Sequence, residues 1–122
     1  MIQSNIQIIL YITGGITASV FLQFLAPALY LRTMNKVTVE GPIGLFFARA
    51  WALPVAAIGV LLIWAGMDPA LRVPVILVAA VAKALFVATI FANRKAVGSG
   101  YNLTAIFDTV CVLLYAGYLL GL

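Results

Sequence analysis

Four long runs of apolar residues alternate with short polar connections along the chain. Each run is close to the roughly 20 residues that a helix needs to cross the hydrocarbon core of a bilayer. Apolar residues fill these runs almost without alternation, which is typical of helices buried in lipid. The pattern predicts an all-α fold, an integral membrane bundle of four transmembrane helices in a single domain over residues 1–122. The expected spans are residues 6–31, 43–66, 72–93 and 101–120.

Prolines and small residues refine this prediction. Pro27 and Pro54 lie inside the first and second runs and predict kinks there. Asp68 directly before Pro69 is typical of a helix N-cap, and we expect it to be structural. Small or polar residues recur every three or four positions, which favours close helix packing along these faces. The predicted faces are Gly15, Ser19, Gln23, Ala26 and Tyr30 in the first run, Ala48, Ala52 and Ala56 in the second, and Ala80, Ala84 and Ala88 in the third.

The composition agrees with a membrane protein. Hydrophobic residues make up 66% of the chain and charged residues only 8%, with a mean hydropathy of +1.20, whereas soluble domains have roughly 25% charged residues. The net charge of +4 is not concentrated in a basic helix, so we expect no nucleic acid partner. A lone cysteine, Cys111, and the lack of histidine argue against a conventional zinc, copper or haem site. No metal and no cofactor are predicted.

The charged residues of the connections predict an orientation. With four spans, the first and third connections lie on one side of the membrane and the second lies on the other. The second connection holds one basic residue, Arg72. The positive-inside rule then puts the first and third connections in the cytoplasm and both termini outside. The basic residues of those two connections are Arg32, Lys36, Arg94 and Lys95.

Lys83 is the most informative residue of the chain, because it lies near the middle of the third apolar run. A lysine in hydrocarbon is costly and usually faces a partner or a cavity. Asp108 is the only acidic residue inside any of the runs, and we expect the two to pair. Thr104, Cys111 and Tyr115 share a helix face with Asp108 by their spacing.

Each predicted helix also contributes one strongly polar residue at a similar depth: Gln23, Arg49, Lys83 and Asp108. At about 1.5 Å per residue, they lie roughly 10–15 Å from the cytoplasmic edge of the bundle. We therefore expect a polar layer in the cytoplasmic half of the membrane.

Three interpretations of this layer remain open. It is a structural network that fixes helix register, a site for an amphipathic or lipid-like molecule, or a surface that docks a larger membrane complex or a second copy. Two cations against one anion favour an anionic or polar head such as a phosphate, a carboxylate or a quinone carbonyl. The candidate ligand-binding residues are Gln23, Arg49, Lys83, Thr104, Asp108 and Tyr115.

An enzyme is the alternative to a binding protein or accessory subunit. Asp108 and Lys83 would be its catalytic acid–base pair, acting on a lipophilic substrate in an isomerase, hydratase or cyclase type of reaction. A single carboxylate without histidine or an activated nucleophile favours binding over catalysis. A small proton-coupled exporter is less favoured. The familiar four-helix exporters have an essential glutamate in their first helix, and the first run here has no acidic residue.

The second and third runs resemble a known group of proteins. The matching stretches are Ala48-Arg49-Ala50-Trp51, Gly59 to Ile63, Asp68 to Pro74 and Ala82-Lys83-Ala84. Across residues 45–95 the chain resembles small uncharacterised bacterial four-helix membrane proteins, which are similar in shape to the DoxX-like proteins. The resemblance implies four transmembrane helices in a bacterial inner membrane, with membrane lipids as neighbours. It implies no active residues.

Overall fold

The computed structural model describes all 122 residues, of which 84% are helical and none is in a strand. The last three apolar runs each form one long helix, within two residues of the predicted bounds. Together with residues Gln3–Leu25 of the first run, they give four helical segments long and apolar enough to cross a membrane. The three long helices are α4 (Gly41–Met67), α5 (Arg72–Ala92) and α7 (Asn102–Leu119).

The first run is not the single helix over residues 6–31 that the sequence predicts. At Ala26 the backbone leaves the helix (φ −141°, ψ 73°), because the ring of Pro27 disfavours the helical conformation in the residue before it. The predicted interruption at Pro27 is therefore confirmed, whereas α4 continues through Pro54 without a break. The run divides into α1 (Ile2–Ala18), α2 (Phe21–Leu25), α3 (Pro27–Tyr30) and a short π-helical turn η1 (Leu31–Asn35).

The turn between α4 and α5 is fixed by its two charged residues. Asp68 Oδ1 accepts a hydrogen bond from Ala70 N at 3.1 Å, which caps the 3₁₀ turn η2 (Pro69–Leu71) as predicted. Arg72 donates to the carbonyls of Ala65 and Gly66 at 3.0 and 2.9 Å. A cation at the carboxyl end of a helix also interacts favourably with the helix dipole. The third connection contains the short helix α6 (Arg94–Val97).

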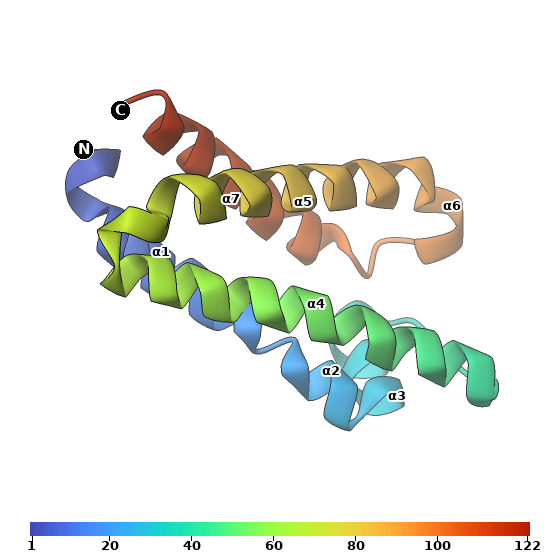
Figure 1. Cartoon of the computed structure of the whole chain (residues 1–122). Helices are drawn as coiled ribbons and strands as arrows, with labels where there is room; N and C mark the ends of the chain where they lie inside the picture. The colour runs from blue at the N-terminus through green and yellow to red at the C-terminus, as the bar shows by residue number, and fades with distance from the viewer.

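The long helices form two pairs that separate toward one end of the molecule (Figure 1). α1 runs beside α4, and α5 runs beside α7. Both termini lie at the end where α4 and α5 are joined, and Met1 N donates to Leu122 O at 3.3 Å. The hydrophobic core takes two residues from each long helix: Ile6, Leu10, Leu62, Ala65, Ile76, Ala79, Cys111 and Tyr115.

Glycine allows α1 and α4 to approach closely. A Cβ atom on Gly59 would lie 2.7 Å from Gly14 O, so no larger residue fits there without displacing backbone. The predicted small-residue face of α4 is confirmed, since Ala48, Ala52 and Ala56 are all buried.

Two other predicted small-residue faces are confirmed only in part, since Gln23 is buried and Ala80 is partly buried. In the first run Gly15 and Ser19 are exposed, and the buried glycine is Gly14, one position earlier. In α5 the alanines Ala84 and Ala88 are exposed. The buried face of α5 instead carries Ile76, Ala79, Lys83 and Ile90.

Replacing Gly59 by alanine tests the close contact between α1 and α4. Because the new methyl group meets backbone atoms of α1 rather than a movable side chain, we expect Gly59→Ala to destabilise the fold by about 1–3 kcal/mol. The measurement is thermal unfolding in detergent, followed by circular dichroism. Gly15→Ala is the matched control, because a Cβ there meets nothing within 4 Å. Equal melting temperatures for the two variants would contradict this packing.

Candidate functional site

Lys83 and Asp108 form an ion pair between α5 and α7. Lys83 Nζ lies 2.8 Å from Asp108 Oδ1, and both side chains are only 8% exposed. The predicted pairing is therefore confirmed. A buried pair of this kind offsets the cost of removing each charge from water, but only while both partners are present.

The remaining partners of the Lys83 ammonium come from α1 and α7. Lys83 Nζ donates to Thr17 Oγ1 at 3.0 Å and lies 5.0 Å from the centre of the Phe107 ring. The Thr17 hydroxyl donates to Thr13 O at 2.7 Å, so its oxygen lone pairs are available to the lysine. Sequence reasoning missed Thr17. The signal was the spacing of Ile6, Leu10, Thr13 and Thr17, which places them on one helix face.

Tyr115 serves the packing of helices and does not reach the cavity described below. Its hydroxyl donates to Thr13 Oγ1 at 2.6 Å, and the side chain is fully buried. The predicted ligand-binding role of Tyr115 is therefore corrected to a structural one. The hydrogen bond joins α7 to α1 beneath the ion pair.

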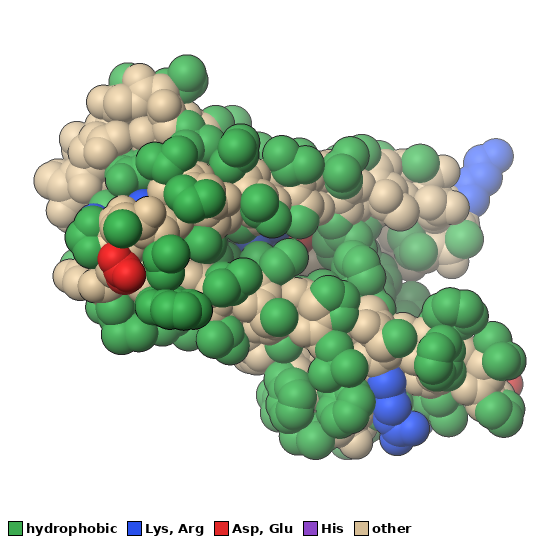
Figure 2. All heavy atoms as spheres, viewed as in Figure 1, with side chains coloured by type: hydrophobic (Ala, Val, Ile, Leu, Met, Phe, Trp, Pro, Cys, Tyr) green, Lys and Arg blue, Asp and Glu red, His purple; other side chains and the backbone are tan.

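A cavity of about 710 Å³ lies between the two diverging pairs of helices. Gln23, Thr104 and the ion pair of Lys83 and Asp108 all line it, so four of the six predicted ligand-binding residues share one cavity. Lys83 and Asp108 are its only charged lining residues. Figure 2 shows a hollow between α4 and α5 on the side of the bundle, with charged side chains at its floor.

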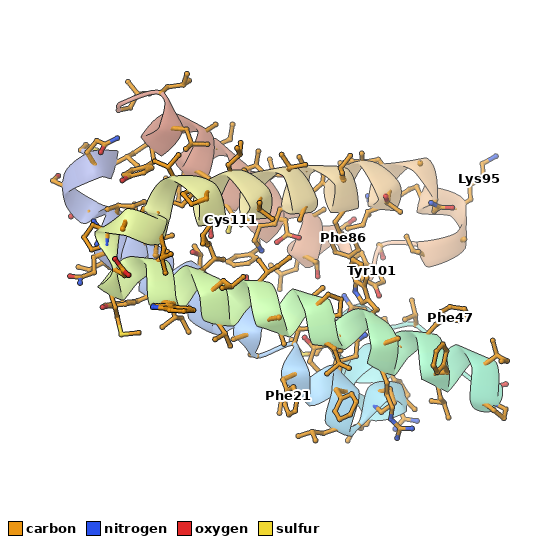
Figure 3. All side chains as sticks on the ribbon, viewed as in Figure 1. Phe21, Phe47, Phe86, Lys95, Tyr101 and Cys111 are labelled. Carbon is orange, nitrogen blue, oxygen red and sulfur yellow. The ribbon has the colours of Figure 1, made fainter.

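Aromatic residues form the part of the cavity wall between α4, α5 and the start of α7. The Trp51 and Phe86 rings are 5.1 Å apart, and Phe86 meets Tyr101 edge to face at 6.2 Å. Phe86 and Tyr101 lie next to each other below α5 in Figure 3. This wall offers an apolar aromatic surface to a hydrocarbon chain or ring.

Polar groups surround the end of the cavity near the first and third connections. Asn35 Nδ2 donates to Thr104 Oγ1 at 3.2 Å, which joins η1 to α7. A Cβ on Gly100 would overlap Asn35 O, so the two connections touch at this point. The phenols of Tyr30 and Tyr101 are neutral at pH 7, and burial raises the pKa of both above the ordinary value of 10.0.

Gln23 lies in the cavity wall with one of its two N–H donors used by the protein. Its Nε2 donates to Ala48 O at 2.8 Å, and the residue is 4% exposed. This bond ties α2 to α4 at the buried alanine face. Gln23 thus has both a structural partner and a place in the cavity wall.

Arg49 is the exception to the predicted polar layer. It is exposed and lines a separate apolar groove on the outside, next to Pro42 and Phe46. The buried face of α4 passes through Ala48, and the next residue points about 100° away from it. Arg49 Nε donates to Phe24 O at 3.3 Å, at the end of α2 where carbonyls lack helical partners. Arg49 therefore supports the helix break and contributes no charge to the cavity.

Comparison with known proteins finds no matching family model, no similar curated protein and no similar solved structure. The resemblance to small four-helix membrane proteins thus stays a prediction. No group of three or more His, Cys, Asp or Glu side chains lies together in a way that would hold a metal ion. The chemistry available to the cavity is hydrogen bonding, one ion pair and apolar contact.

A double-mutant cycle tests the ion pair. We expect Lys83→Met and Asp108→Leu to cost about 3–5 kcal/mol each, because either change leaves an unpaired charge in a buried place. The double variant should be more stable than either single one, since both charges are gone. Unfolding in detergent measures all three. Lys95→Met, which alters a lysine that points away from the bundle (Figure 3), should have no effect. Additive losses would show that the two side chains do not interact.

Proposed function

We propose that this chain is an integral membrane protein of the bacterial inner membrane. The support is its outer surface, where large apolar side chains such as Phe47, Ile106 and Leu113 are between 61% and 67% exposed. Figure 2 shows apolar side chains over most of the visible face. An apolar surface of this extent suits lipid and would be a liability in water.

The proposed orientation follows from the charges at the two ends of the bundle. Four basic residues lie in the connections at the end away from the termini, and Arg72 at the opposite end is used to cap α4. We place the first end in the cytoplasm and both termini outside.

The function that we propose is the binding of an amphipathic, lipid-like molecule in the cavity between α4 and α5. The observation that carries the proposal is the buried Lys83–Asp108 pair in the wall of a 710 Å³ cavity. That volume lies within the range of roughly 300–1,000 Å³ typical of small-molecule sites. The hollow opens on the side of the bundle, so in a membrane a ligand would enter from the lipid. Aromatic residues would contact its chain and the polar wall its head.

Two further roles stay compatible with this binding function. An accessory subunit of a larger membrane complex could hold the same ligand at its interface. An acid–base enzyme is the second candidate, since the carboxylate and the ammonium are 2.8 Å apart beside the cavity.

An enzyme that has lost the carboxyl group of its acid–base pair should accumulate its substrate. The masses released from wild-type protein and from Asp108→Asn would then differ, whereas a binding protein would release the same molecule or none.

Filling the cavity tests the binding proposal. Ala82 lines the cavity, whereas Ala84 on the same helix is exposed and outside it. We expect Ala82→Phe to lose at least about tenfold of any small molecule retained through purification, because the ring occupies ligand space. Ala84→Phe should retain the wild-type amount. Native mass spectrometry of protein extracted in mild detergent measures the bound mass. Equal retention by the two variants would exclude this cavity as the site.

Cysteine labelling tests the orientation. Cys111 is buried and should give little background with a membrane-impermeant maleimide. We expect Ser4→Cys to be labelled in intact spheroplasts and Ser99→Cys to be labelled only after the membrane is opened, because they lie at opposite ends of the bundle. The reverse pattern would place the termini in the cytoplasm.

A further inference from the structure

We infer that the cavity selects a lipid whose head is an uncharged hydroxyl group, such as a long-chain or isoprenoid alcohol, over fatty acids and lipid phosphates. This inference rests on the proposed binding function and narrows the class of ligand. It follows from which polar atoms of the cavity already have partners and which do not.

The cation of the cavity has protein partners for two of its three N–H donors. An ammonium group has three N–H bonds. Around Lys83 Nζ the structure provides Asp108 Oδ1 at 2.8 Å, Thr17 Oγ1 at 3.0 Å and the face of the Phe107 ring at 5.0 Å. An anionic head would find only one N–H left, on the side of the Phe107 ring, unless it displaced Asp108 or Thr17. Lys83 is therefore arranged to hold Asp108 rather than a ligand.

The carboxylate, in contrast, keeps one oxygen available. Asp108 Oδ1 accepts from Lys83, but Oδ2 accepts no hydrogen bond from the protein. The only fully enclosed side-chain polar atom without a partner is Asn102 Oδ1. Oδ2 thus retains accessible surface, and Asp108 lines the cavity. Gln23 adds a second acceptor of this kind, because its amide oxygen has no protein partner while one N–H of its Nε2 is held by Ala48 O.

The charge balance of the cavity disfavours carboxylate, phosphate and amine head groups. Arg49 lies outside, so the formal charges of Lys83 and Asp108 sum to zero, and the excess positive charge expected from the sequence is absent. A carboxylate or phosphate would bring a second anion close to Asp108 Oδ2. An amine would satisfy Oδ2 but would add an uncompensated cation next to Lys83. A hydroxyl donates to Oδ2 without changing the charge, which avoids the cost of a buried unpaired ion.

Trp51 offers a direct readout of binding, because it lines the cavity while Trp64 does not. The experiment uses the full chain with Trp64→Phe, reconstituted in phosphatidylcholine vesicles. Three probes of equal chain length carry bromine atoms in mid-chain, which quench tryptophan on contact: dodecanol, dodecanoic acid and dodecylamine. We expect saturable quenching of Trp51 by the alcohol, at concentrations at least about tenfold below any saturation by the acid or the amine.

A second comparison uses variants that keep the cavity neutral. Lys83→Met with Asp108→Leu removes both charges and the acceptor oxygen, and should raise the half-saturating alcohol concentration roughly tenfold. Arg49→Met is the control and should leave it unchanged. Saturation by the acid or the amine ahead of the alcohol would overturn the inferred ligand class and leave the proposed binding function standing. Quenching that never saturates with any probe would overturn the binding function itself.

Discussion

The ion pair between Lys83 and Asp108 is the constraint on which the arrangement of the helices depends. A lysine in the middle of an apolar helix is tolerated only with a partner, and the nearest carboxylate lies on α7, 2.8 Å away. Thr17 extends the same contact to α1. Three helices are thereby held in one register at one depth. Moving any of them along its axis would leave a buried charge or hydroxyl without its partner.

The position of this pair also explains why the bundle has two different halves. On the side of the termini, all four long helices contribute apolar residues to one core. Toward the end that holds the first and third connections, α4 and α5 diverge and a cavity replaces the core (Figures 1 and 2). The ion pair lies in the cavity wall, while the bond between Tyr115 and Thr13 is buried deeper among the helices. The rigid half thus supports a polar group that a molecule in the open half can reach.

The sequence was sufficient for the coarse structure and for the central pair. The apolar runs gave three of the four long helices within two residues, and a single acid among four apolar runs left Lys83 one plausible partner. Depth along a helix was also predictable from residue counts. The direction in which a side chain points around the helix axis was not predictable from residue counts. This is why Arg49 was wrongly expected to face the interior. In a helix that is apolar on all sides, one residue of difference rotates a side chain by about 100° without any change in the pattern.

The hydrogen bonds that uncharged hydroxyl groups make between helices were the other feature that could not be predicted from the sequence. Threonine in a helix often bonds only to its own backbone, as Thr89 does here. Only their spacing with Ile6 and Leu10 on one helix face separated Thr13 and Thr17 from it. Their role depends on the contact between α1 and α4 at Gly14 and Gly59 and on the contact between α7 and α1. Those are properties of packing, and they appear only when the helices are assembled.

A distance measurement in a lipid bilayer is the most direct test of the ion pair between Lys83 and Asp108. Solid-state NMR of protein labelled with ¹⁵N at lysine Nζ and ¹³C at aspartate Cγ reports on three lysines and two aspartates. We expect one strong dipolar coupling, from the Lys83–Asp108 contact at 2.8 Å, and its loss in the Lys83→Met variant. A bilayer sample without any such coupling would mean that the two charges are apart, and the polar cavity described above would have to be abandoned.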